Sequence, residues 1–171
     1  MTMAVVRNDP KYQALCALLR GMGPVAIAFS GGVDSTFLAA AAKDALGAAK
    51  VLLVTAYSET YGRREREEST RLAAQLGLER LTLETSELAI PAFRTNPPDR
   101  CYHCKKELFT AMQAAVAARG AYVLCDGSNA DDTGDFRPGR RALGELGVRS
   151  PLLEAGFTKA DIRRLSQALG L

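Results

Sequence analysis

The chain has 171 residues, of which 47% are hydrophobic and 24% charged, and its 22 basic and 19 acidic side chains leave a net charge of +3. This composition excludes a disordered chain, and the length predicts a single domain over residues 1–171. No run approaches the roughly 18 apolar residues of a membrane span, and the first residues lack the pattern of a signal peptide. The charge is too weak to indicate nucleic-acid binding. We therefore expect a cytoplasmic protein without membrane or nucleic-acid partners.

The first half of the chain alternates short apolar runs with longer helical ones. Residues 25–29 predict a buried strand that ends at a pair of glycines, and residues 35–46, rich in alanine and leucine, predict a helix. A second strand over residues 51–55 and a second helix over residues 63–76 follow, and a glycine ends each helix. Residues 81–83 predict a short third strand.

The second half continues this alternation. Turn-forming residues lead into a helix over residues 101–119, a fourth strand covers residues 122–125, and an amphipathic helix covers residues 158–169 with Thr158 as its N-cap. Strands and helices in this order predict an α/β fold, a Rossmann-like doubly wound parallel sheet with helices on both faces. The loops that leave the strands then share one edge of the sheet, and ligands bind where the strand order reverses.

A loop rich in glycine and serine joins the first strand to the first helix, and we call it the phosphate loop: Ser30, Gly31, Gly32, Val33, Asp34 and Ser35. Its glycines let the backbone approach an oxyanion closely, and its N–H groups and the following helix N-terminus favour a phosphate. Asp34 would repel a phosphate unless a cation lay between them, and Mg²⁺ prefers carboxylate and phosphate oxygens together. The pattern matches neither a Walker A loop nor a dinucleotide fingerprint. It predicts a site for a pyrophosphate group that carries Mg²⁺.

Ser-Gly-Gly-Val-Asp-Ser after the first strand resembles the PP-loop ATP pyrophosphatases, which include GMP, NAD and asparagine synthetases and several tRNA thiolases. The resemblance implies that ATP is split between its α- and β-phosphates with Mg²⁺, giving AMP and pyrophosphate, and that the phosphate loop binds the ATP. It further implies that Ala56, Tyr57 and Ser58, at the end of the second strand, receive the adenine ring through their backbone.

Four further motifs narrow the resemblance. The first begins at Asn96 and reads Asn-Pro-Pro-Asp-Arg-Cys-Tyr-His-Cys-Lys, and the second begins at Asp126 and reads Asp-Gly-Ser-Asn-Ala-Asp-Asp. The third begins at Asp135 and reads Asp-Phe-Arg-Pro-Gly-Arg-Arg-Ala, and the fourth begins at Glu145 and reads Glu-Leu-Gly-Val-Arg-Ser-Pro-Leu. In this order, they resemble the LarE family of ATP-dependent sacrificial sulfur transferases in nickel-pincer nucleotide biosynthesis. That resemblance implies that a carboxylate of a pyridinium-3,5-biscarboxylic acid mononucleotide attacks the α-phosphate of ATP. A sulfur nucleophile then displaces AMP and leaves a thiocarboxylate.

Other site residues are assigned from their place in this pattern. Asp126 and Gly127 end the fourth strand and should face the nucleotide across the switch point. We assign Gly127 to close backbone approach, and Asp126 either to a second Mg²⁺ contact or to capping the following turn. Four arginines carry planar donors that suit a substrate carboxylate or phosphate, with ordinary surface charge as the alternative: Arg137, Arg140, Arg141 and Arg149.

Two of the four cysteines, Cys101 and Cys104, open the helix over residues 101–119. The resemblance implies that some LarE relatives use such a pair, with a later cysteine, to hold a [4Fe–4S] cluster with a labile sulfur. We assign both residues to cluster or sulfur chemistry, and a redox disulfide or a structural role are the alternatives. Cys16 and Cys125 lie in apolar patterns typical of core residues.

The same resemblance sets a limit on what the chain does. The LarE family continues past residue 171, and its sulfur-donating cysteine lies in that later part, so we expect a fragment of a homo-oligomeric protein that adenylates without transferring sulfur. Three alternatives stay open. They are a PP-loop ligase that uses ammonia or glutamine, a nucleotide-binding module without catalysis, and a tRNA thiolase, which the weak net charge disfavours.

Overall fold

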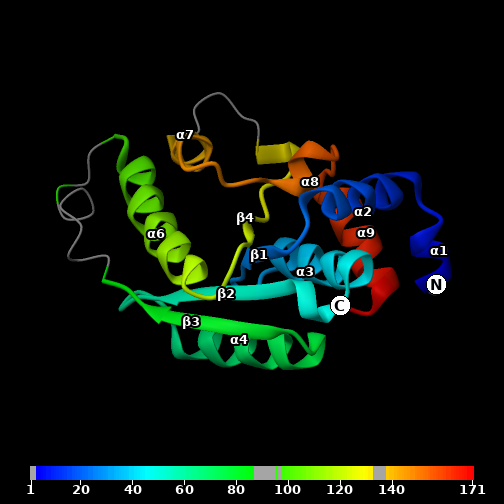
Figure 1. Cartoon of the computed structure of the whole chain (residues 1–171), viewed down its shortest axis with the longest axis horizontal. Coiled ribbons are helices and arrows are strands. Elements are labelled where there is room, and N and C mark those ends of the chain that lie inside the picture. Colours follow the sequence, from blue (N-terminus) through cyan, green and yellow to red (C-terminus); the bar gives the residue numbers. More distant parts are fainter. Residues whose placement is uncertain (1–2, 87–94, 96–97, 133–137) are drawn as a thin grey trace.

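The computed structural model describes residues 3–86, 95, 98–132 and 138–171. Its centre is a sheet of four parallel strands in the order β3-β2-β1-β4 (Figure 1). The strands are β1 (Val25–Ala28), β2 (Val51–Tyr57), β3 (Glu79–Glu84) and β4 (Val123–Cys125). Val25 pairs with Val51 on one side and with Val123 on the other, so β1 is a central strand. Apolar runs without alternation are typical of such buried parallel strands.

Helices connect the strands and cover both faces of the sheet. They are α1 (Met3–Arg7), α2 (Pro10–Met22), α3 (Val33–Leu46), α4 (Arg63–Leu76), α6 (Arg100–Ala117), α7 (Pro138–Glu145), α8 (Pro151–Glu154) and α9 (Lys159–Leu169), with short 3₁₀ turns at Ala48–Lys50 and Ala130–Asp132. The parallel sheet and its crossover helices confirm the predicted α/β doubly wound fold. The apolar pattern predicts α3, α4, α6 and α9 to within two residues at each end, but it does not predict the short helices α1, α7 and α8.

Two hydrophobic clusters fill the space between the sheet and its helices. The larger one packs α2, α3, α4 and α9 against one face, and its centre holds Phe37 and Phe157, whose ring centroids lie 5.6 Å apart. The smaller one packs α6 and α7 against the other face through Phe109 and Met112. Figure 1 shows α6 and α4 on opposite sides of the sheet. Cys16 and Cys125 are buried, as the sequence predicts, and burial raises the pKa of the Cys125 thiol to about 12.

The strand order reverses between β1 and β4, because the chain passes from β1 outward to β2 and β3 and then returns to the other side of β1. The loops that follow β1 and β4 therefore leave the sheet next to each other, which is where doubly wound sheets bind ligands. Within the described ranges, no helix combines the length and the apolar character that crossing a bilayer requires.

The start of α9 is tied to α2 by a half-buried carboxylate. Asp161 forms a capping box with Thr158, whose backbone N–H and hydroxyl both donate to it at 3.0 Å. The Lys11 ammonium donates to the same oxygen at 2.6 Å, and the Asp161 side chain is 19% exposed. The Lys11 contact, followed by the Thr158 N–H, lowers the pKa of Asp161 to about 2.

This lowered pKa predicts a dependence of stability on pH. Because the folded pKa lies below the unfolded value of about 3.9, Asp161 stabilises the fold above pH 4 and loses that contribution as the pH falls through 2. Replacing Asp161 with asparagine should lower the free energy of unfolding by roughly 2 kcal/mol at pH 7. Urea unfolding at pH 7, 4 and 2 should show the difference between wild type and variant shrinking toward zero. Glu68→Gln, which removes an exposed pair on α4, serves as the control and should change stability by under about 1 kcal/mol.

Candidate active site

The phosphate loop leaves β1 and enters α3 through contacts among its own residues. The backbone N–H of Gly32 donates to the Ser30 hydroxyl at 3.2 Å, and the Ser35 hydroxyl donates to the Gly32 carbonyl at 3.3 Å. The Ser30 and Ser35 hydroxyls lie 3.3 Å apart. On its outer side, Tyr61 donates its hydroxyl to the Ser30 carbonyl at 2.8 Å, and burial raises the pKa of Tyr61, so the hydroxyl keeps the proton that it donates.

The first turn of α3 offers backbone donors to an anion. Gly32 is the N-cap and supplies no side-chain oxygen to the first N–H groups of the helix. These N–H groups have no acceptor within the helix itself, and the helix dipole adds positive potential at the same place. A phosphate oxygen is the kind of acceptor that fits such an end. This geometry agrees with the binding role that the sequence predicts for the phosphate loop.

Asp34 is held by two residues from distant parts of the chain. The amide nitrogen of Asn129 donates to Oδ2 at 3.0 Å, and the Lys159 ammonium donates to Oδ1 at 2.7 Å. The Asp34 side chain is 23% exposed, so it lies at the surface of the site rather than within the core. One carboxylate of this kind, combined with phosphate oxygens and water, is a usual set of Mg²⁺ ligands. The predicted magnesium role of Asp34 fits this chemistry, with Lys159 as the counter-charge in this structure.

Gly127 lies directly against the start of α3. A Cβ at this position would come within 3.2 Å of the Ser35 backbone nitrogen and 3.4 Å of the Asp34 carbonyl carbon, so a side chain would push on the phosphate loop. The close backbone approach assigned to Gly127 is therefore an approach to the loop itself. Asp126, the residue before it, accepts hydrogen bonds from the hydroxyls of Ser128 and Ser150, both at 2.6 Å. These contacts are the turn-capping alternative, and the second magnesium contact at Asp126 stays a prediction.

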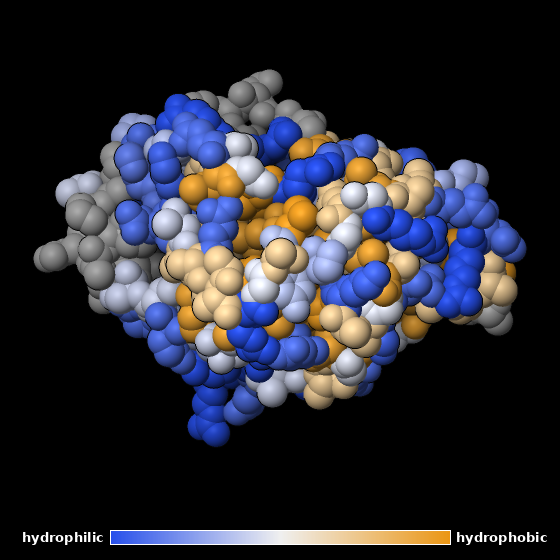
Figure 2. Space-filling view, in the orientation of Figure 1, coloured by the Kyte–Doolittle hydropathy of each residue, from blue (hydrophilic) through white to orange (hydrophobic). Residues whose placement is uncertain are grey.

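A cavity of about 770 Å³ opens beside the phosphate loop, between the ends of β1 and β2 and one face of α6. Ser30, Ala56 and Ser58 line it from the strand ends, and Cys101 and Cys104 line it from α6. Apolar surface collects in a hollow near the middle of the face shown in Figure 2, on the side of α6 where Figure 1 places β4 and α7. The structure thus brings together two groups of predicted site residues that lie 43 to 74 positions apart in the sequence.

The three residues predicted for the adenine ring divide between the two faces of the sheet. Ala56 and Ser58 line the cavity, whereas the side chain of Tyr57 lies on the opposite face. There its hydroxyl accepts from Arg80 at 2.9 Å and lies 3.2 Å from the hydroxyl of Ser69 on α4. Alternation along a strand explains the split, since neighbouring side chains point to opposite faces. Tyr57 can therefore contact a ligand in the cavity only through its backbone, and a backbone contact with the adenine ring is the role predicted for it.

Among the described residues, the two cysteines of α6 form no disulfide, and Cys101 is exposed while Cys104 is half-buried. His103, between them, pairs with Asp99 at 2.9 Å. Across the described ranges, no group of three or more cysteine, histidine or acidic side chains could hold a metal ion. A [4Fe–4S] cluster needs about four ligands, so these two thiols alone do not fit one. Both cysteines stay predicted catalytic residues on the evidence of the shared cavity.

Of the arginines predicted for substrate binding, the three that the structure describes do not line this cavity. Arg149 donates to Glu154 through both Nε and a terminal nitrogen, and the Glu154 contact raises the pKa of Arg149. Arg141 stacks on the ring of Tyr102 at 4.2 Å, and Arg140 is exposed. Arg137 lies outside the described residues. The described arginines are not among the residues that line the cavity, so their substrate role stays a prediction.

Four site residues are missed by reasoning from the sequence. Asn129 and Lys159 hold Asp34, and two cations, Arg100 and Lys105, line the cavity beside the cysteines. Helical spacing could have found Lys105, because it follows Cys101 by four residues and so shares its face of α6. Asn129 lies within the motif that begins at Asp126, but no local signal gives its role or marks Lys159, since only the fold brings them 95 and 125 positions back to Asp34.

Comparison with known proteins agrees with this architecture. The model of the asparagine synthase family matches residues 12–122. The chain is 37% identical over 161 residues to a pyridinium-3,5-bisthiocarboxylic acid mononucleotide synthase of Lactiplantibacillus plantarum, covering 94% of this chain and 58% of the relative. It is 43% identical over 145 residues to an uncharacterised Synechocystis protein, covering 85% and 54%. The chain therefore spans about half the length of the curated relatives it matches.

Among solved structures, an NH₃-dependent NAD synthetase from Campylobacter jejuni superposes with a TM-score of 0.68 at 18% identity, covering 94% of this chain and 72% of that one. The fold and the phosphate loop together define an α/β protein of the PP-loop class. The chain belongs to the asparagine synthase family, and its predicted resemblance to LarE is confirmed.

Proposed function

We propose that this chain adenylates a carboxylate of a pyridinium-3,5-biscarboxylic acid mononucleotide with ATP and Mg²⁺, as the first step of a sulfur transfer. The observation that carries the proposal is the cavity that the phosphate loop shares with Cys101 and Cys104. The name of the L. plantarum relative, a bisthiocarboxylic acid mononucleotide synthase, supports the same acceptor and the same product.

In the first step, an oxygen of the acceptor carboxylate forms a bond to the α-phosphorus of ATP, and the bond from that phosphorus to the bridging oxygen breaks. Pyrophosphate leaves with the bonding electrons, and an acyl-adenylate remains. A carboxylate is already ionised, so this step needs alignment and charge neutralisation rather than a protein base. The amides at the start of α3 and the Ser30 and Ser35 hydroxyls would hold the phosphates. Asp34 would hold Mg²⁺, which neutralises charge on the departing pyrophosphate.

In the second step, a sulfur nucleophile attacks the acyl carbon, and AMP leaves as the carbon–oxygen bond to its phosphate breaks. Attack by a cysteine thiolate would leave a thioester, and the thiocarboxylate would be released by β-elimination: a base takes the Cα proton of that cysteine, the Cβ–S bond breaks with its electrons on sulfur, and dehydroalanine remains in the chain. Cys101 and Cys104 are the thiols that the structure places on the wall of this cavity. We also propose that residues 1–171 form a single domain and that the protein assembles into a homo-oligomer.

The test is release of pyrophosphate from ATP on addition of the biscarboxylate mononucleotide, with transfer of sulfur followed by mass spectrometry in the whole protein. We expect release with the acceptor and little without it. A nucleotide-binding module would bind ATP and release nothing, which would overturn the proposal.

Replacing both Cys101 and Cys104 with serine separates sulfur transfer from amidation. We expect the yield of thiocarboxylate to fall at least about 100-fold, because serine oxygens cannot supply or relay sulfur. Cys16→Ala is the matched control, since its thiol lies in the core next to α3 and not on the cavity. An amidating ligase would instead form its product at the wild-type rate with ammonia or glutamine in the double variant.

A further inference from the structure

Lys105 is a cation on the cavity wall that forms no ion pair with a carboxylate in the parts of the chain that the structure describes. Its ammonium lies 6.0 Å from the centroid of the Phe109 ring, and the side chain is half-buried. The next residue behaves differently, because the Lys106 ammonium donates to the Tyr102 hydroxyl and to Glu145, both at 3.0 Å. Of these two adjacent lysines, Lys106 pairs with a carboxylate, whereas Lys105, on the cavity wall, has no carboxylate partner among the described residues.

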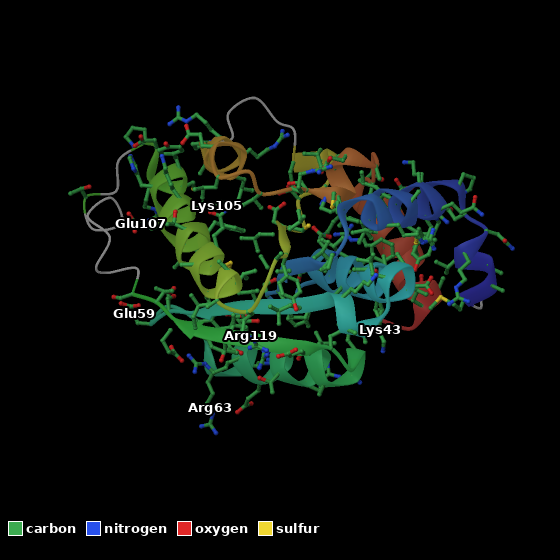
Figure 3. All side chains as sticks on the ribbon, in the orientation of Figure 1. Lys43, Glu59, Arg63, Lys105, Glu107 and Arg119 are labelled. Atoms are coloured by element: carbon green, nitrogen blue, oxygen red, sulfur yellow. The ribbon has the colours of Figure 1, made fainter. Side chains whose placement is uncertain are left out.

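The stem of Lys105 is fixed by the packing of α6 against α7. A Cβ at position 139 would lie 2.9 Å from the Lys105 Cδ and 3.2 Å from its Cε, so the stem lies against the bare backbone of Gly139. Figure 3 shows Lys105 on the side of α6 that faces α7, and Glu107 on the other side. A side chain held in this way loses little rotamer freedom when a ligand arrives, which favours binding.

Three further charged residues line the same cavity, namely Glu65, Arg100 and Glu107. Glu65 accepts from the Gly62 backbone N–H at 3.3 Å and caps the start of α4, and Glu107 is exposed. Neither carboxylate pairs with Lys105. A half-buried ammonium beside an aromatic ring has lost part of its hydration, and an anionic ligand would replace that lost interaction.

We propose that Lys105 binds an acidic group, a carboxylate or a phosphate, of the acceptor. This inference rests on the proposed function, because it assigns the acceptor to the α6 wall of the same cavity. Lys105 follows Cys104 directly and shares the helix face of Cys101, whereas Ser30 of the phosphate loop lines the same cavity from the end of β1. An acceptor bound by Lys105 would lie beside the two thiols and face the phosphate loop.

The experiment compares wild type with Lys105→Met and Lys106→Met in the whole protein. Methionine keeps an apolar stem of similar length against Gly139, so Lys105→Met removes the charge and preserves the packing. Binding of ATP and binding of the biscarboxylate mononucleotide are each measured by calorimetry, and the KM for the acceptor is measured from pyrophosphate release. The dephosphorylated acceptor serves as a second probe.

We expect Lys105→Met to weaken acceptor binding about 10- to 100-fold and to leave the Kd for ATP within about twofold, while Lys106→Met matches wild type. A loss that persists with the dephosphorylated probe assigns the contact to a carboxylate, and a loss that disappears assigns it to the phosphate. Unchanged acceptor binding, or a loss confined to ATP, would overturn the proposal. If wild type binds the acceptor without releasing pyrophosphate, the proposed function fails while the calorimetry still decides the role of Lys105.

Discussion

Replacing Asp34 with alanine is expected to lower acceptor-dependent release of pyrophosphate by about 10³-fold. The change removes the carboxylate that would hold Mg²⁺ beside the phosphate loop. It also leaves the Lys159 ammonium and the Asn129 amide without the acceptor that they share at 2.7 and 3.0 Å. Release should be measured as a function of Mg²⁺ concentration at saturating ATP. Asp34→Asn keeps the shape but not the charge, and it should need a higher Mg²⁺ concentration for the rate that remains.

Asp44 provides the matched control for this prediction, since it is a second aspartate on α3 at the opposite end of the helix. It pairs with Arg7 and accepts from the Tyr12 hydroxyl at 3.1 Å, so Asp44→Ala should lower stability and leave the rate per folded molecule near that of wild type. Release within tenfold of wild type in Asp34→Ala would contradict a magnesium role for Asp34.

The pair between Asp34 and Lys159 connects the phosphate loop to the last helix. Lys159 opens α9, and its backbone N–H donates to Asp131 at 2.8 Å, next to the Asn129 that also holds Asp34. If Asp34 holds Mg²⁺ as proposed, the ion would share this carboxylate with the Lys159 ammonium, and the phosphates of ATP would supply negative charge for both cations. We therefore expect nucleotide binding to affect the phosphate loop and the start of α9 together.

The sequence predicts the parts of this site whose signals are local. The phosphate loop is read from two glycines between an apolar run and an alanine-rich helix, and the structure has β1 end at Ala28 and α3 begin at Val33 around it. The parallel sheet follows from the alternation of strands and helices. A helical pattern that starts near Cys101 predicts α6 and therefore places both cysteines in its first turns.

The remaining parts depend on contacts between distant segments, which a single sequence does not encode as a pattern. Nothing near Lys159 distinguishes it from a surface lysine at the start of an amphipathic helix. The four arginines are predicted from their side-chain chemistry alone, and the pairing of Arg149 with Glu154 depends on a turn that this chemistry does not reveal. Helix α7 has only eight residues, two of them glycines with low helix propensity, so a single sequence gives little sign of it, although it positions Lys105.

Replacing Gly31 with alanine is expected to distort the backbone of the phosphate loop. Gly31 has a φ of +84°, and a Cβ there would lie 3.0 Å from both Cα and Cβ of Ser69 on α4. The variant therefore carries backbone strain and also has to move the loop away from a neighbouring helix. A shift of about 1 Å in the loop amides should lower release of pyrophosphate about 100-fold.

Gly47 allows the strain to be separated from the contact. It has the same φ of +84°, but a Cβ there meets nothing within 4 Å. Gly47→Ala should cost about 1–3 kcal/mol of unfolding free energy from strain alone and keep the wild-type rate of release. Gly31→Ala should cost at least about 1 kcal/mol more in urea unfolding, because the contact with Ser69 adds to the strain. Equal stability losses in the two variants, with release unimpaired in Gly31→Ala, would show that α4 does not press on the loop and that the loop geometry tolerates a side chain.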